Sequence, residues 1–449
     1  MSMIRVLPAL MQKLPAIRLY ATSTVMLTSG IFAQSVGFVV LARWLGSDQF
    51  GHLATITAVT NVGGAWCGLG AGEAIRRRVG REPSLYRAML GHSLILLLVS
   101  GVVLTAIVSV GMAFLIRVAP SPLENFEAIL LLVASNMLLF AWVGLTEQIH
   151  LAHHQFAAAN RVNASWGITR AVAALVACLA FEIDTVLAWA MWNAVVSVLL
   201  SAACAATLSR YGAPQWRLLR DEVPLGATLS MSACIAGLRQ NADLLALSSV
   251  APPHLVGAYG VARRVISTAT VVGSSFDRLI YAKLAVAGTN GPSETLRLAK
   301  RYVLYGIGLT AATSAAVFLA SPFLPLLFGS DFTDAVWITR LLCWTLILTA
   351  IQFIAFDALN AADRHRIRLI VGTAVGIAGA ALIVALSFAF GTTGTFVAVY
   401  LAEMSTAGAL WQTLRLVSDR RPTSSGATAA RPYSDKESKG QVAFVKGKC

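Results

Sequence analysis

The chain has 449 residues, of which 57% are hydrophobic and only 12% are charged. A soluble domain carries about 25% charged residues, and apolar stretches of about 20 residues, long enough to cross a bilayer, recur along this chain. The composition therefore excludes a soluble protein and predicts an all-α polytopic membrane protein.

The net charge of +14 first suggests a nucleic-acid partner. The basic residues, however, are concentrated in the short loops between apolar stretches, where membrane topology explains them better. We therefore expect no nucleic acid to bind. The six cysteines are scattered without metal-ligand spacing, so the sequence predicts no disulfide framework, no metal site and no cofactor.

Residues 1–18 place apolar side chains on one helical face and basic ones elsewhere, which suits a helix lying in the membrane interface or a basic topogenic tail. Twelve membrane spans follow, near 19–42, 50–72, 88–116, 126–148, 164–182, 184–208, 224–250, 256–281, 302–326, 335–360, 367–390 and 393–416. Arginine and lysine are abundant in alternate loops, which places both termini in the cytoplasm by the positive-inside rule. The last segment, 417–449, is predicted to be a disordered cytoplasmic tail.

A weak internal repeat relates the two halves. The segment Gly46–Ala54 matches Pro252–Gly260 at a shift of 206 residues, and the same shift carries the first two spans onto the seventh and eighth. Six spans per half predict two parallel lobes related by a pseudo-twofold axis along the membrane normal. The predicted divisions are an interfacial segment 1–18, an N-lobe 19–210, a cytoplasmic linker 211–223, a C-lobe 224–416 and the tail 417–449.

Charged residues interrupt the seventh and eighth spans. Arg239, Asp243, Arg263 and Arg264 lie within them, and a charge at the centre of a membrane helix costs about 2.5–3.5 kcal/mol on the insertion scale. The repeat maps the first three onto uncharged residues of the N-lobe. The cluster therefore belongs to one lobe, which favours a functional role over a requirement of the fold.

Several short motifs, in this order, resemble the polysaccharide transporter family, the O-antigen and exopolysaccharide flippases of the multidrug/oligosaccharidyl-lipid/polysaccharide exporter superfamily. The motifs are Ala42–Gly46 with Phe50–Gly51, Asp243–Leu245, Val256–Arg264, and Leu327–Gly329 with Phe332. The resemblance implies two V-shaped lobes around a central cationic cavity. It also implies a flippase, not an enzyme, in a bacterial inner membrane.

By the same resemblance, the substrate is an undecaprenyl-diphosphate-linked oligosaccharide, and the partners are membrane lipid and polysaccharide polymerase or export proteins. Lipid II flippases carry a basic residue deep in the first span, whereas this span has no basic residue between Arg18 and Arg43, and the polar residues deep in it include Ser29, Gln34 and Ser35. This difference argues against lipid II as the substrate.

Four arginines are candidates for the diphosphate, because arginine pairs its donors with phosphate oxygens. Arg239 is the first choice, although it also lies four residues from Asp243, at the spacing of an intrahelical pair. Arg263 and Arg264 point about 100° apart, so we expect one of them to face the cavity directly while the other snorkels. Arg170 is the fourth candidate.

The acidic residues have two expected roles. Asp243 and Glu403 are candidates for coupling to H⁺ or Na⁺, or for the charge partners of arginines. Glu73, Glu147, Asp277 and Asp357 lie at predicted cytoplasmic helix ends, where gate or interface salt bridges would explain them. Gly64, Gly68 and Gly72, four residues apart, predict close helix packing or a hinge in the second span.

Two alternatives remain open. A drug or organic-cation exporter of the same superfamily would need an acidic cavity, whereas this one has a basic balance. A membrane-embedded polysaccharide polymerase or glycosyltransferase would need a large extramembrane loop or an acidic metal motif, and the predicted periplasmic loops are short.

Overall fold

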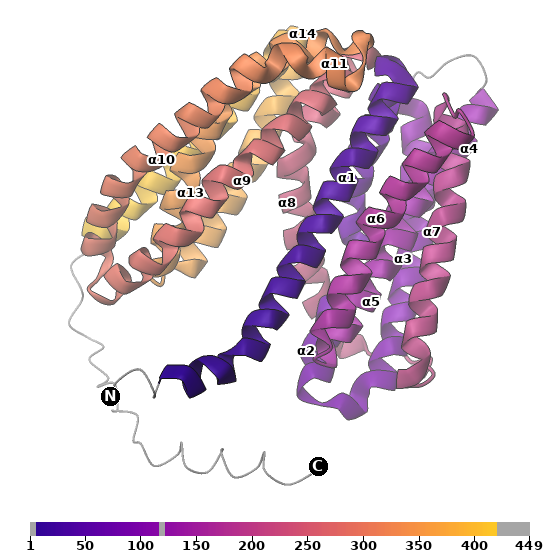
Figure 1. The fold of residues 1–449 in the computed structure, drawn as a ribbon, viewed down its shortest axis with the longest axis horizontal. Coiled ribbons are helices and arrows are strands. Elements are labelled where there is room, and N and C mark those ends of the chain that lie inside the picture. Colours follow the sequence, from indigo (N-terminus) through magenta and orange to yellow (C-terminus); the bar gives the residue numbers. More distant parts are fainter. Residues whose placement is uncertain (1–5, 116–121, 420–449) are drawn as a thin grey trace.

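A computed structural model describes residues 6–115 and 122–419 (Figure 1). Helices account for nearly all of this part of the chain, and it contains no strand. The helices are α1 Val6–Gly63, α2 Ala71–Arg81, α3 Tyr86–Leu115, α4 Pro122–Ala134, α5 Phe140–Ala152, α6 Phe156–Ala180, α7 Val186–Leu208, α8 Val223–Val250, α9 Pro253–Thr289, α10 Pro292–Ala320, α11 Leu324–Phe328, α12 Asp334–Leu342, α13 Thr345–Ala361 and α14 His365–Asp419. Residues 1–5 of the predicted interfacial segment and the predicted tail from 420 onward lie outside the described residues.

The twelve predicted spans all fall on helices. Helix α1 contains the first span and most of the second and is interrupted at Gly46, and α14 contains the last two and is interrupted at Gly391. Both glycines have positive φ, 70° and 62°, a backbone conformation that glycine adopts without steric cost. The all-α polytopic fold class predicted from the sequence is therefore confirmed.

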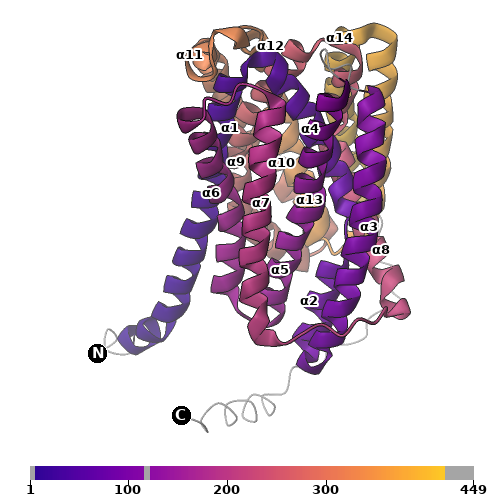
Figure 2. The same ribbon diagram turned by 90° about the vertical axis from the view of Figure 1, so that its right-hand side faces the viewer.

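The helices form two lobes, α1–α7 and α8–α14, that meet at one end and splay apart at the other (Figure 1). In a view turned by 90°, most of the long helices run in nearly the same direction, as expected for a bundle that crosses a bilayer (Figure 2). Seven stretches of the described chain are long and apolar enough to span a membrane by length and composition alone. Helices α8 and α9 are not among them, because they carry the polar and charged cluster.

The contact between the lobes has the symmetry of the sequence repeat. A Cβ atom on Gly51 would lie 2.0 Å from the carbonyl oxygen of Pro253, and one on Gly257 would lie 2.2 Å from that of Ser47. Gly51 and Ser47 correspond to Gly257 and Pro253 at the shift of 206 residues. Glycine is therefore needed at both positions for α1 and α9 to cross at this distance.

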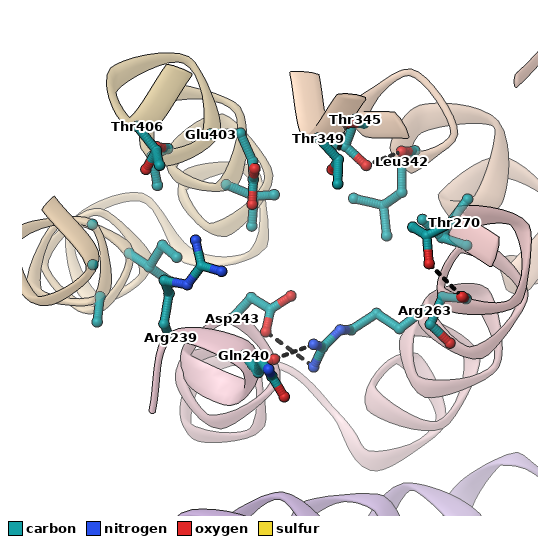
Figure 3. Close-up of a pocket in the computed structure, with 18 of the residues that line it drawn as sticks. Arg239, Gln240, Asp243, Arg263, Thr270, Leu342, Thr345, Thr349, Glu403 and Thr406 are labelled. Atoms are coloured by element: carbon teal, nitrogen blue, oxygen red, sulfur yellow. Dashed lines mark hydrogen bonds and ion pairs between the residues drawn. The ribbon is translucent and has the colours of Figure 1, made fainter. Parts of the chain in front are cut away.

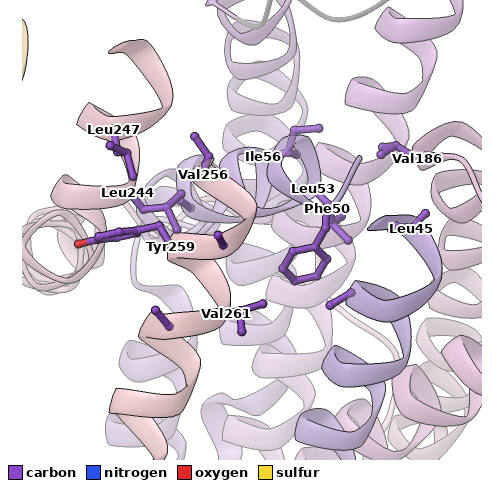
Figure 4. Packing of buried hydrophobic residues seen from close by; sticks show 14 of the residues in the cluster. Leu45, Phe50, Leu53, Ile56, Val186, Leu244, Leu247, Val256, Tyr259 and Val261 are labelled. Carbon is purple, nitrogen blue, oxygen red and sulfur yellow. The ribbon is translucent and has the colours of Figure 1, made fainter. Parts of the chain in front are cut away.

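Aromatic side chains complete the closed end. The rings of Phe38 and Phe50 from α1 lie 5.0 Å apart, edge to face, and Phe50 lies 6.0 Å from the ring of Phe332. Edge-to-face packing of this kind is favourable beyond the apolar area that it buries. Figure 4 shows Phe50 beside residues of α9, including Val261, so the apolar core is continuous from one lobe to the other.

At the splayed end, the linker between the lobes is fastened to the N-lobe. The amide of Gln215 donates to the carbonyl of Arg87 at 2.8 Å, and the guanidinium of Arg78 pairs with the buried Glu222 at 2.5 Å. Burying Glu222 without a cation would be costly, so this ion pair fixes the start of α8 against α2.

The second predicted span is broken where its glycines cluster. Helix α1 ends at Gly63, a 3₁₀ turn follows, and α2 begins at Ala71 after Gly68 and Gly70, which both have positive φ. A Cβ atom on Gly70 would lie 2.3 Å from the carbonyl oxygen of Gly226 in α8. The chain bends within the predicted glycine segment, but the close approach is at Gly70, which is not among the glycines predicted to pack closely. A Cβ atom on Gly64, Gly68 or Gly72 would meet its neighbours at ordinary contact distances.

Candidate functional site

A cavity of about 480 Å³ lies between the lobes. It is lined by α1, α6, α8 and α9, with one aromatic residue each from α5 and α7. Three arginines face it, Arg170 from the N-lobe and Arg263 and Arg264 from the C-lobe. Among the described residues that line it there is no aspartate or glutamate, so this inter-lobe cavity is cationic.

Arg264 connects the lobes across this cavity. Its guanidinium donates to Ser35 Oγ of α1 at 3.0 Å and lies 5.5 Å from the centre of the Phe38 ring. Its Nε is buried and donates to no atom of the described residues. No described carboxylate in this cavity neutralises Arg264, and a half-buried cation without an acid favours an oxyanion as its ligand.

Arg170 is held on the opposite wall by an aromatic ring. Its guanidinium lies 5.3 Å from the centre of the Trp166 ring, one turn earlier on α6. This cation–π contact directs the side chain without neutralising its charge. Phe38 and Phe140 add further aromatic surface to the same cavity, and the buried Phe50 and Trp189 lie behind it.

A second cavity, of about 290 Å³, lies within the C-lobe between α8, α9, α12, α13 and α14 (Figure 3). Its charged lining residues are balanced: Arg239 and Arg263 face Asp243 and Glu403. Thr345, Thr349 and Thr406 add hydroxyl groups. This C-lobe cavity therefore combines two cations with two carboxylates.

Asp243 is the most fully bonded of these groups. Its Oδ1 lies 3.1 Å from a terminal nitrogen of Arg263, and its Oδ2 accepts a hydrogen bond from the Tyr259 hydroxyl at 2.6 Å. The amide of Leu244 donates to the same carboxylate at 2.8 Å. The ion-pair partner of Asp243 is thus Arg263 on the next helix, whereas the sequence suggested Arg239 on the same helix.

Glu403 lies on α14 and is held by a neighbouring amide. Gln352 Nε2 donates both to the Glu403 carboxylate and, at 3.0 Å, to the Glu403 backbone carbonyl. Figure 3 shows the Arg239 guanidinium on the same side of the cavity as Glu403. Within the described part of the chain, Arg239 makes no hydrogen bond or ion pair, so its charge acts on Glu403 through space.

The structure divides the predicted diphosphate residues between the two cavities. Arg170 and Arg264 line the inter-lobe cavity, Arg239 lines the C-lobe cavity, and Arg263 lines both. Both Arg263 and Arg264 line the inter-lobe cavity, but the Arg263 guanidinium is turned towards Asp243 in the C-lobe. The expectation that one of the two faces the substrate directly stays a prediction.

The predicted gate carboxylates make contacts within single lobes. Glu73 pairs with Arg76 and Arg77 of its own helix at 2.6 and 3.2 Å. Glu147 accepts from Asn163 at 3.1 Å. Asp357 lies beside Asp277 of the same lobe. Their role as gates stays a prediction for a conformation in which the splayed end closes.

Two features of the site were not anticipated from the sequence. Tyr259 and Gln352 orient the two carboxylates, but each lies in an apolar stretch where the sequence gives no signal beyond a single polar atom. The structure also shows two cavities where one was expected. Among the described residues, no cluster of three or more metal-ligating side chains occurs.

Comparisons with known proteins agree on the architecture. No family model and no curated protein sequence matches the chain. Among solved structures, an inward-facing multidrug resistance MATE family transporter of the MOP superfamily matches with a TM-score of 0.70 at 15% identity, over 88% of this chain and 97% of that one. The lipid II flippase MurJ, in an inward closed conformation, matches with a TM-score of 0.68 at 12% identity, over 87% of each chain.

The chain shares the fold of these solved structures. An outward-facing MATE family transporter gives a lower TM-score of 0.56, at 18% identity over 89% of this chain and 94% of that one. The chain therefore overlaps better with the two inward-state structures.

Proposed function

We propose that the chain is a flippase that moves a polyprenyl-diphosphate-linked oligosaccharide across the bacterial inner membrane, with both termini in the cytoplasm. The observation that carries this proposal is the charge of the inter-lobe cavity: three arginines line it, and its described lining residues include no carboxylate. A lipid diphosphate carries about two negative charges and accepts paired donors from arginine.

The aromatic lining supports the same substrate class. Phe140 and Trp166 line the inter-lobe cavity together with the amide side chains of Gln34 and Asn61. Rings offer flat apolar surfaces for sugar and isoprenoid groups, and amides provide hydrogen bonds to hydroxyls. The cavity thus combines an anion site with surfaces for the rest of the molecule.

The C-lobe cavity has a separate proposed role. Asp243 and Glu403 supply carboxylates for a coupling ion, H⁺ or Na⁺, and Arg239 acts as the charge partner of Glu403. Alternating access would then follow from rocking of the two lobes about the Gly51–Gly257 contact. The substrate's oligosaccharide would be consumed on the far side by a polymerase or export partner.

A drug or organic-cation exporter is the second candidate. The observation that favours it is the likeness to MATE family transporters, whose overlap with the chain is as extensive as that of MurJ. An organic cation would have to enter a space where Arg170 and Arg264 have no carboxylate beside them among the described lining residues, and their charges would repel it. The cavity charge therefore favours the anionic lipid.

Transport by purified protein in vesicles distinguishes these candidates. We expect the full chain to translocate a fluorescent polyprenyl-diphosphate sugar, measured by its loss of accessibility to an impermeant quencher, and to leave ethidium uptake at the level of empty vesicles. Arg264→Gln should slow translocation of the lipid, with equal amounts of folded protein in the membrane. Ethidium uptake without lipid translocation would contradict the proposal.

A further inference from the structure

Arg263 belongs to both cavities. Together with Ser267 it lines the inter-lobe cavity and the C-lobe cavity, whereas Arg239, Arg170 and Arg264 each line one of them. Its guanidinium is turned into the C-lobe, where it binds the Asp243 carboxylate and the Gln240 backbone carbonyl (Figure 3). The Arg263 side chain is 29% exposed and that of Asp243 14%, so this ion pair borders open space.

Asp243 and a diphosphate would compete for the same guanidinium. Both are oxyanions that accept paired donors from arginine, but a diphosphate carries more charge and offers more oxygens. Beside Arg170 and Arg264, an anion in the inter-lobe cavity would draw Arg263 away from Asp243. The carboxylate would then keep only the Tyr259 hydroxyl and the Leu244 amide.

Loss of Arg263 would leave the C-lobe cavity unbalanced. The ionisable groups that face it are Arg239 and Asp243 from α8, Tyr259 and Arg263 from α9, and Glu403 from α14. Its lining residues from α12 and α13 are uncharged. Two cations oppose two carboxylates while Arg263 is present. Without Arg263, only Arg239 remains to balance the two carboxylates. An unpaired charge in a largely buried site is strongly unfavourable.

We propose that Arg263 couples the two cavities, so that binding of an anionic substrate between the lobes makes the C-lobe cavity take up one monovalent cation, H⁺ or Na⁺, at Asp243 and Glu403. This inference rests on the proposed function, because it requires an anion in the inter-lobe cavity. Thermodynamic linkage makes the effect reciprocal. The bound cation increases the affinity for the anion by the same factor by which the bound anion increases the affinity for the cation.

The test is calorimetric binding of farnesyl diphosphate to the full chain in detergent. One arm varies the pH from 6 to 8 in sodium-free choline buffers, and the other varies Na⁺ at fixed pH and ionic strength. Uptake of one cation per anion predicts an affinity that rises up to about tenfold for each unit by which the pH falls, or for each tenfold increase in Na⁺. The two arms identify which cation is taken up.

Two substitutions should remove this dependence while moving the affinity in opposite directions. Asp243→Asn keeps the shape of the side chain but releases Arg263, so the anion should bind more tightly. Arg263→Gln removes a cation, so the anion should bind more weakly. In both variants, the affinity for farnesyl diphosphate should change with pH only as much as protonation of the farnesyl diphosphate itself requires, and it should not change with Na⁺. The pH dependence of binding to Asp243→Asn measures this contribution of the probe.

Controls separate coupling from misfolding. Glu294→Gln removes an acid from an ion pair with Arg297 on the surface of α10, away from both cavities, and should keep the wild-type dependence. The paired variant Arg263→Gln/Asp243→Asn keeps the C-lobe charge balanced and should fold and show no dependence. Wild-type binding with one affinity at every pH and Na⁺ concentration would overturn the coupling alone. Failure to bind farnesyl diphosphate at all would overturn the proposed substrate class as well.

Discussion

The two cavities differ in how their arginines are neutralised. In the C-lobe cavity each arginine has a carboxylate within the same space, and Arg263 and Asp243 are in direct contact. In the inter-lobe cavity, the described neighbours of Arg170 and Arg264 are uncharged: the Trp166 ring beside Arg170, and the Ser35 hydroxyl and the Phe38 ring beside Arg264. Burying cations without acids is costly unless a ligand supplies the negative charge. The first cavity is therefore balanced by the protein, and the second is left for a substrate to balance.

The N-lobe shows why the balanced cavity occurs only once. Gly37 stands where the repeat would place a counterpart of Asp243, and a Cβ atom there would lie 3.0 Å from the Ala171 Cα of α6. Helix α6 therefore packs directly against α1 at the position that a side chain would need. At equivalent positions, the C-lobe therefore has a charged cavity, whereas the N-lobe has closely packed helices.

The largest effect is expected where the two lobes meet. Gly257→Ala would place a Cβ atom 2.2 Å from the Ser47 carbonyl oxygen, and overpacking of this kind costs about 1–3 kcal/mol or more. Helix α9 forms the wall between the cavities, so its displacement should disturb both. We expect a lower midpoint of thermal unfolding in detergent.

Gly308→Ala is the matched control, because a Cβ atom on Gly308 in α10 has nothing within 4 Å. Replacing an exposed helical glycine by alanine stabilises a helix by up to about 1 kcal/mol. Equal unfolding midpoints for the two variants would contradict the symmetric contact between α1 and α9.

Replacing single arginines should have a smaller effect, and it tests directly which of the two cavities binds the anion. A hydrogen bond to a charged group contributes about 1.5–3 kcal/mol, so Arg170→Gln should weaken farnesyl diphosphate binding about 10- to 100-fold. Arg239→Gln removes the same charge from the C-lobe cavity and should cause a smaller loss. The reverse order, measured by calorimetry, would place the anion in the C-lobe.

Sequence reasoning located the spans because their apolar lengths match a bilayer, and the repeat at 206 residues located the contact between Gly51 and Gly257. It could not find the partner of Asp243. Spacing along one helix favours Arg239, but the distance from α8 to Arg263 depends on how two helices cross. The sequence also could not show that there are two cavities, because this depends on the position of α9 between them.

The most direct test of the central claim is an experimental structure of the full chain with a polyprenyl diphosphate bound. We predict the diphosphate in the inter-lobe cavity, in contact with Arg170 and Arg264, with Arg263 turned away from Asp243. A diphosphate bound in the C-lobe cavity against Arg239, with Arg263 still paired to Asp243, would contradict this account.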